Sequence, residues 1–298
     1  MPLLPLLVAT ALVAGPDTVR WTVFNHGRVA GELREIRTGD SIAVRWRYRD
    51  RQRGPRTEVR YVLGRDGTPI SLAVHPLTLR GEPATTPIET VRLDTDSVRW
   101  TAAGRTGAVA TRDGFYRHRG ATPWETARLA AWLLRRPDGR GVVLPEGLTA
   151  RATVVADTTV TTRGGARQRL RLVAIDSLAF GQTRLWLDER GALAAVADGW
   201  FQPVRHGFED ALPALRAREL AEIARRDTDR ARRLAPRGAP ALVVRDGDVF
   251  DSETGRVRPR TSVVIEGDRI TQVGDFATLR IPAGARVLDA RGRAIVPG

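Results

Sequence analysis

The chain has 298 residues, 42% of them hydrophobic, no cysteine, and a formal net charge of +14. The absence of cysteine excludes disulfide bonds, zinc–thiolate centres and thiol catalysis. All 48 basic residues are arginines, spread along the whole chain, and no RNA-binding aromatic motif or recognition helix accompanies them. The charge therefore predicts nonspecific adhesion to anionic surfaces and no specific nucleic-acid partner.

The N-terminal segment is apolar and uncharged. Residues 2–15 read PLLPLLVATALVAG, which is shorter than the roughly 20 residues that a membrane-spanning helix needs. Its length and the small residues Ala14 and Gly15 are typical of a secretory signal, although the usual positive start is missing. We predict a signal peptide over residues 1–16, a periplasmic or secreted location and no stable membrane span. A first strand or helix of the mature domain is the alternative.

Residues 17–208 show the alternation of apolar and polar side chains that predicts an antiparallel sheet with one buried face. The clearest strand places Ile42, Val44, Trp46 and Tyr48 on one face. Further strands are predicted at 18–24, 59–63, 70–74, 98–101, 152–161, 168–175, 183–187 and 192–196. This region is predicted to be a β-rich accessory domain.

One helix is predicted within that domain, at about residues 122–136. Thr122-Pro123-Trp124-Glu125 is a capping box with proline at the first helical position. A helix laid against a curved sheet can leave an apolar hollow that suits a lipid or small ligand. The alternative is that Trp124 and Trp132 simply fill the core, which is the more common role of such residues.

Residues 209–240 are predicted to form a charged helix followed by a linker. The helix, at about 210–234, has only a thin apolar stripe. Glu219 and Glu222, with Arg225 and Arg226, predict a solvated face with helical ion pairs. Pro236, Gly238 and Pro240 then predict a stiff linker and a domain boundary.

Residues 241–298 predict a meander of about five short strands. Leu242–Val244 is apolar and is followed by Asp246-Gly247, which indicates a turn. Other short strands are predicted at 249–250, 261–265, 270–273, 287–289 and 294–296. A piece of this size buries little apolar surface by itself.

The order of these turns, the Ile270–Gly274 segment and the terminal Pro297-Gly298 resemble the opening of amidohydrolase-superfamily enzymes, such as imidazolonepropionase-like and dihydroorotase-like members. The resemblance implies that these strands form part of a small β-sandwich completed by strands from the far C-terminal end. A generic β-rich module is the alternative.

The resemblance also implies where the chemistry of such an enzyme lies. In the family, Pro-Gly is followed by a His-x-His on the first strand of a catalytic barrel, where one or two divalent metals, commonly zinc, activate a water that attacks a C–N bond. A (β/α)₈ barrel of about 250 residues does not fit in this chain beside the other regions. We therefore expect no catalytic barrel and no metal ligand here.

The candidate site residues do not form a catalytic motif. None of His26, His75, His118 and His206 is paired at i, i+2 or i, i+4, the spacings at which two histidines share a metal. His118, in the sequence Phe-Tyr-Arg-His-Arg, indicates either an anion pocket or an exposed loop. Asp289 matches a family position that is usually structural. We therefore predict no catalytic, cofactor-binding or metal-binding residue in this chain.

Together, these observations predict a mainly β chain with two helices (α+β): a signal at 1–16, the accessory domain at 17–208, the helix and linker at 209–240, and part of a sandwich at 241–298. The chain is predicted to be the N-terminal fragment of an exported metal-dependent amidohydrolase that acts on non-peptide or dipeptide C–N bonds. The fragment alone is predicted to be inactive. A small-molecule substrate is expected only where the barrel is present. The alternatives are a non-catalytic periplasmic ligand- or lipid-binding module and a structural β-protein.

Overall fold

The structure is a computed structural model that describes residues 17–51, 53–94, 96–111, 113–234 and 240–297. The expected signal at 1–16 and the linker residues Pro236 and Gly238 lie outside the described residues. The chain divides into two compact units, Met1–Arg225 and Arg226–Gly298, which we call unit 1 and unit 2.

The described chain is mostly β with two helices, which confirms the predicted fold class. Unit 1 contains fifteen strands and helix α1 (Pro123–Leu134), and α2 (Leu212–Leu234) begins in it. The strands are β1 (Asp17–Asn25), β2 (Arg28–Thr38), β3 (Ser41–Tyr48), β4 (Arg56–Leu63), β5 (Pro69–Pro76), β6 (Glu89–Leu93), β7 (Ser97–Ala102), β8 (Arg105–Ala110), β9 (Phe115–Tyr116), β10 (Arg140–Leu144), β11 (Leu148–Thr161), β12 (Arg167–Asp176), β13 (Thr183–Asp188), β14 (Leu193–Ala195) and β15 (Gln202–Arg205).

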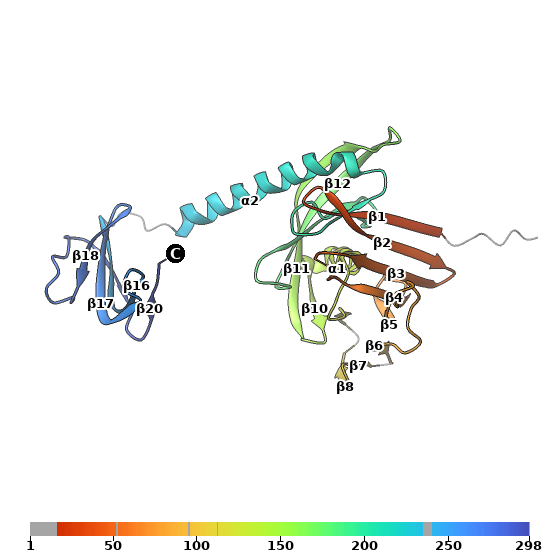
Figure 1. Cartoon of the computed structure of the whole chain (residues 1–298), viewed down its shortest axis with the longest axis horizontal. Coiled ribbons are helices and arrows are strands. Elements are labelled where there is room, and N and C mark those ends of the chain that lie inside the picture. The colour runs from red at the N-terminus through yellow and green to blue at the C-terminus, as the bar shows by residue number, and fades with distance from the viewer. Residues whose placement is uncertain (1–16, 52, 95, 112, 235–239, 298) are drawn as a thin grey trace, which may run out of the picture. The chain divides into compact units, whose positions relative to one another are not determined.

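These strands form one sheet in the order β8-β7-β6-β5-β4-β3-β2-β1-β15-β14-β13-β12-β11-β10-β9. The pairings are antiparallel except for β9 with β10, which run parallel. In Figure 1, α1 lies between β10 and β11 on one side and β3 to β5 on the other. Among the described residues the path does not close, because its end strands β8 and β9 are not paired with each other.

The strand register places one row of side chains on the same face of β2 to β6. Glu35 lies opposite Val44, Val44 opposite Val59, Val59 opposite Val74, and Val74 opposite Glu89. Residues directly opposite each other in a sheet point to the same side. The row is therefore apolar in the middle and carries a carboxyl group at each end, both on the face that packs against α1.

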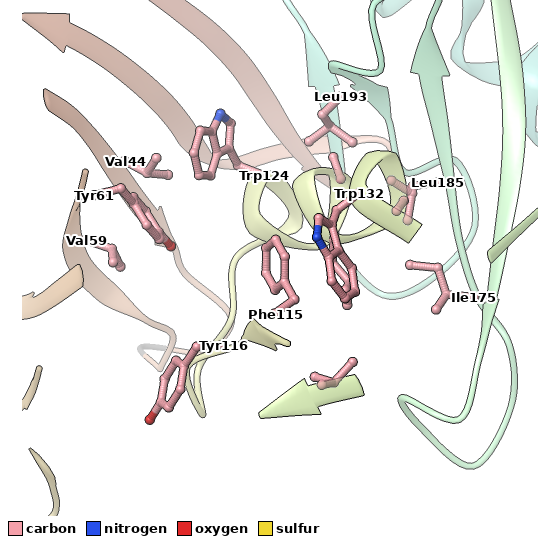
Figure 2. Close-up of a cluster of buried hydrophobic side chains, with 14 of the residues drawn as sticks. Val44, Val59, Tyr61, Phe115, Tyr116, Trp124, Trp132, Ile175, Leu185 and Leu193 are labelled. Atoms are coloured by element: carbon pink, nitrogen blue, oxygen red, sulfur yellow. The ribbon is translucent and has the colours of Figure 1, made fainter. Parts of the chain in front are cut away.

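The core of unit 1 lies on both faces of β12 and β13. Ile175, Leu185 and Leu187 face the cluster around α1, whereas Leu172 and Trp186 face a second cluster that includes Leu215 of α2. Trp124 and Trp132 on α1 are only 3% and 4% exposed, and Figure 2 shows both among the buried apolar side chains. The interpretation that these two tryptophans fill the core is confirmed.

Helix α2 carries one unexpected buried charge. Glu222 is paired with Arg225 at 2.7 Å, as helical spacing predicts. Glu219, however, is 2% exposed, so its assignment to the solvated face was wrong. It lies one turn after buried Leu215, and residues four apart share a helix face.

Unit 2 is a small sheet of five strands: β16 (Ala241–Asp251), β17 (Arg256–Glu266), β18 (Arg269–Gly274), β19 (Arg286–Asp289) and β20 (Ala294–Ile295). Their order is β18-β17-β16-β19, and β20 also pairs with β16. Both β19 and β20 run parallel to β16. The predicted simple meander was therefore wrong, because a meander contains antiparallel neighbours alone.

The predicted turn at Asp246-Gly247 was also wrong. These two residues lie inside the continuous strand β16, where the register with β17 shifts. Asp246 has a φ of 56°, and its backbone N–H donates to Ser262 Oγ at 3.0 Å. Such a bulge uses the same residue types as a turn. At Gly247 a Cβ would come within 2.6 Å of the Ile295 side chain, so glycine permits β20 to approach.

Candidate functional site

The four histidines lie apart. His26 packs edge-on against Trp200, with ring centroids 5.0 Å apart. His75 is 7% exposed, and its Nδ1 lies 2.8 Å from the Ala84 carbonyl oxygen. The His206 side chain is 73% exposed. His118 is 2% exposed, so the exposed-loop alternative for this residue was wrong.

His118 is buried against Glu125 at the start of α1. The Glu125 backbone N–H donates to Thr122 Oγ1 at 3.2 Å, which is half of the predicted capping box. In the other half, the glutamate would accept from the backbone of the capping residue. Instead, its carboxylate accepts from the His118 backbone N–H at 3.1 Å and from the Tyr61 hydroxyl at 2.9 Å, and it forms an ion pair with His118 Nδ1.

These contacts favour a charged imidazolium at His118. Burial opposes protonation, but the attraction and hydrogen bond of Glu125 outweigh burial, with a contribution from Glu89, and raise the His118 pKa. Burial, followed by the charge of Glu125, raises the pKa of Tyr61 well above its ordinary value, so its hydroxyl remains a donor. Since Nδ1 faces Glu125, the second ring nitrogen, Nε2, is the donor that remains for another partner.

A second buried carboxylate lies nearby, at the end of the row described above. Glu89 is 8% exposed, and its Oε1 accepts from the Tyr116 hydroxyl at 2.9 Å. Burial and then the Glu89 charge raise the pKa of Tyr116. Figure 2 shows the Tyr116 hydroxyl pointing away from the apolar cluster. This hydrogen bond joins β6, which is the third strand from one end of the sheet path, to β9 at the other end.

A cavity of about 760 Å³ lies at the same place. Its volume falls in the range of small-molecule sites, which is roughly 300–1,000 Å³. Glu89, Tyr116 and His118 belong to its wall. The remaining lining residues come from β4, β5, β7 and β8 and from the segments that connect strands: Pro55, Thr57, Val74, Ile88, Trp100, Ala102, Ala103, Arg105, Arg119, Gly120, Pro145 and Glu146.

The described residues do not fit the divalent metal that the amidohydrolase resemblance implies. In the described part of the chain, no three His, Asp or Glu side chains are placed so that they could hold a metal ion together. His118, the histidine at the cavity, already pairs with Glu125, whereas a metal-binding histidine offers a neutral ring nitrogen to the ion. We therefore assign no metal-dependent step to these residues.

Asp289, which the resemblance marks as structural, lies on β19 and forms an ion pair with Arg291. Side-chain and backbone hydrogen bonds from Arg291 lower the Asp289 pKa to about 2. Its carboxylate accepts from the Arg291 backbone N–H at 3.0 Å and from Nε at 3.0 Å. The group therefore holds the turn before β20 in place, and no base chemistry is assigned to it.

Long apolar helices of the kind that cross a membrane were not found in the described residues. The α2 helix is the longest of the two and is rich in arginine. Several arginines of unit 1 are paired with carboxylates, for example Arg205 with Asp188 at 2.7 Å and Arg45 with Glu58 at 2.6 Å.

Comparison with known proteins finds similarity over part of the chain. No family model matches. A stretch of 82 residues, 27% of this chain, is 40% identical to adenine deaminase of Rubrobacter xylanophilus and spans 12% of the length of that protein. A prolidase crystallised with N-methylphosphonate-L-proline is 35% identical over 18% of this chain and 13% of its own, and the TM-score of 0.17 is too low for a structural comparison. Adenine deaminase is an amidohydrolase-superfamily member, and a segment of this chain is thus similar to a segment of that superfamily.

Proposed function

We propose that this chain is the N-terminal part of an exported, metal-dependent hydrolase of the amidohydrolase superfamily, and that the catalytic residues belong to a barrel outside residues 1–298. The observation that carries the proposal is the 40% identity to adenine deaminase over 82 residues. The match covers 12% of that enzyme's length, so we also propose, for the whole protein, the activity and the substrate class. Its substrates would be small molecules with a C–N bond, either non-peptide compounds or dipeptides.

The surface of unit 2 supports the proposal. Ala241, Val243, Val263, Val264 and Ala290 are its buried apolar residues. Large apolar side chains are exposed on the same small sheet, and these are Phe250, Val257, Ile270, Val273, Val287, Leu288 and Val296. Exposed apolar residues in such density indicate a surface that another part of a protein covers. We propose that further strands of the same enzyme cover it.

The proposal is tested first on the coding DNA that follows the codon for Gly298. An in-frame His-x-His within a few codons is the expected result. The complete gene product, purified with zinc, is then expected to hydrolyse adenine or a dipeptide, whereas residues 1–298 alone are expected to bind no stoichiometric zinc and to turn over neither compound. Absence of the motif, or zinc-dependent turnover by residues 1–298, would overturn the proposal.

A second candidate function is a non-catalytic ligand-binding module, and the cavity in unit 1 favours it. The cavity is built entirely from unit 1 residues. The two functions are compatible in one polypeptide, since unit 1 and the amidohydrolase-like strands are separate compact units. Ligand binding to the purified chain tests this second function independently of any hydrolysis.

A further inference from the structure

The wall of the unit 1 cavity is largely apolar. Its apolar members come from β5, β7 and the segments before β4, before β6, after β7 and after β10: Pro55, Val74, Ile88, Trp100, Ala102, Ala103 and Pro145. Val74, Glu89 and Ala102 lie in register on neighbouring strands, so their side chains share the inner face of the sheet. Apolar walls with a few fixed polar groups are typical of small-molecule sites.

Two buried polar groups reach this apolar space. His118 and Glu89 are 2% and 8% exposed, and both line the cavity. His118 uses Nδ1 for Glu125, and its Nε2 makes no hydrogen bond with any described residue. Glu89 accepts from Tyr116 through Oε1, whereas its Oε2 has no hydrogen-bond donor among the residues that the structure describes. These two groups therefore offer a hydrogen-bond donor and an acceptor to a molecule in the cavity.

The charges around the cavity balance. Arg105, Arg119 and the His118 imidazolium contribute positive charge, whereas Glu89 and Glu146 contribute negative charge. Glu125, directly behind His118, neutralises the imidazolium. Between His118 and Glu89, a cationic head group would meet the imidazolium, and an anionic one would meet the Glu89 carboxylate. Since like charges repel strongly in a partly desolvated site, the lining favours a neutral ligand.

We propose that this cavity binds a neutral amphiphile, with its apolar body against Val74, Trp100 and Ala102 and a hydroxyl or carboxamide between His118 and Glu89. The ligand oxygen accepts from His118 Nε2–H, and its O–H or N–H donates to Glu89 Oε2. This inference rests on the second candidate function above and adds the chemical class of the ligand. It does not depend on the hydrolase proposal.

The test is calorimetric titration of the full chain with four ten-carbon probes that differ in the head group alone: 1-decanol, decanamide, decanoate and decylamine. Decanol and decanamide are expected to bind about tenfold more tightly than either ion, a ratio that one well-placed polar contact produces. Tightest binding of an ion, or equal binding of all four, would overturn the ligand class while leaving the binding function intact. No binding of any probe would overturn both.

Two substitutions locate the site. Glu89→Gln removes the negative charge, so the preference for decanol over decanoate is expected to fall about tenfold. Glu82→Gln, in the preceding loop and outside the cavity lining, is the matched control and should leave the ratio unchanged. An unchanged ratio in Glu89→Gln would contradict the assigned role of Glu89.

Ala102→Phe fills the cavity and is expected to weaken binding of all four probes by at least about tenfold, because the added ring occupies the ligand volume. Ala108→Phe, at an exposed position on β8, is its control. Urea unfolding followed by tryptophan fluorescence checks that each variant is folded. Undiminished binding by folded Ala102→Phe protein would place the ligand elsewhere and overturn the proposal.

Discussion

Units 1 and 2 both consist mainly of sheet, yet they bury their apolar residues to very different extents. In unit 1, α1 packs on one face of β12 and β13 and the second cluster packs on the other. In unit 2, side chains such as Ile270 and Leu288 remain 65% and 49% exposed. Because stability depends on the apolar surface removed from water, unit 1 is expected to be stable alone and unit 2 to need a covering partner. Two units that both consist mainly of strands can therefore differ in whether they are stable without a partner.

The comparison is accessible to experiment because the seven tryptophans, Trp21, Trp46, Trp100, Trp124, Trp132, Trp186 and Trp200, are all in unit 1. Tryptophan fluorescence therefore follows the unfolding of unit 1, whereas far-UV circular dichroism follows both units. In urea, the circular dichroism change is expected to begin at a lower concentration than the fluorescence change. Coincident transitions would contradict the independence of the two units.

The largest effect is expected at the buried ion pair of unit 1. Glu125→Ala leaves the His118 imidazolium and the Tyr61 hydroxyl without their acceptor, and breaking such a pair costs about 3–5 kcal/mol of unfolding free energy. Urea unfolding followed by tryptophan fluorescence measures it. Glu253→Ala, at an exposed residue of unit 2, is the control and should leave this transition unchanged. A loss below about 1 kcal/mol would show that the pair is not formed.

The next effect compares a leucine from each unit. Leu129, on α1, is 0% exposed and Leu288 is 49% exposed. Leu129→Ala is expected to lower the unfolding free energy of unit 1 by about 2–5 kcal/mol. Leu288→Ala should change that of unit 2 by less than about 0.5 kcal/mol, measured by circular dichroism. A large loss for Leu288→Ala in residues 1–298 would show that this side chain is already covered.

Glu219 gives unit 1 a pH dependence. Burial, followed by the charge of Asp198, raises its pKa to about 7 from the ordinary value of 4.5. The folded state therefore holds the proton more tightly than the unfolded state. The resulting stability is fully present below pH 4.5 and is lost as the pH rises through about 7, with a total on the order of 3 kcal/mol.

The matching variant is Glu219→Gln, in which this loss should disappear. Its unfolding free energy is expected to be nearly constant between pH 5 and 7, as measured by tryptophan fluorescence in urea at each pH, where that of the parent falls. His118, whose pKa is also raised, adds a decline of the same sign at higher pH in both proteins. An identical pH profile for the two proteins between pH 5 and 7 would exclude Glu219 as the source.

The smallest effect is expected at the helix cap. Thr122→Ala removes the side-chain acceptor of the Glu125 backbone N–H and is expected to cost about 1 kcal/mol. Thr122→Ser, which keeps the hydroxyl, is the control and should recover most of the loss. Equal destabilisation by both variants would indicate that the methyl group, and not the hydrogen bond, stabilises the start of α1.

Much of the fold could be predicted from local patterns. The alternation at Ile42, Val44 and Trp46 indicated a strand, and the three residues are buried. The capping box placed the start of α1. The turn predicted at Asp246-Gly247 is instead a bulge in β16. A bulge and a turn use the same residue types, and only the pairing partner of the strand distinguishes them. The parallel pairing of β19 and β20 depends on contacts between distant segments and leaves no local pattern.

The candidate site was harder to predict than the fold. The sequence singled out His118 through its aromatic and arginine neighbours, but its partner Glu125 was interpreted as part of a cap. Glu89 could not be predicted, because a single glutamate at a strand start has no local pattern. Its position follows from the register of five strands, Glu35 to Glu89, and register is set by long-range pairing. For the His118–Glu125 pair the sequence does carry a signal, because the glutamate of the capping box follows the histidine by seven residues. For Glu89 it carries none.

The unpaired ends of the unit 1 sheet have a kinetic consequence. Between β6 and β9 the two ends are joined by the Tyr116–Glu89 side-chain hydrogen bond, whereas neighbouring strands elsewhere are joined by backbone ladders. Separating these ends breaks no ladder, so it is expected to cost far less than global unfolding. Because β8 and β9 each pair with one neighbouring strand, whereas β12 and β13 pair on both sides, amide hydrogens of β8 and β9 should exchange with deuterated water much sooner.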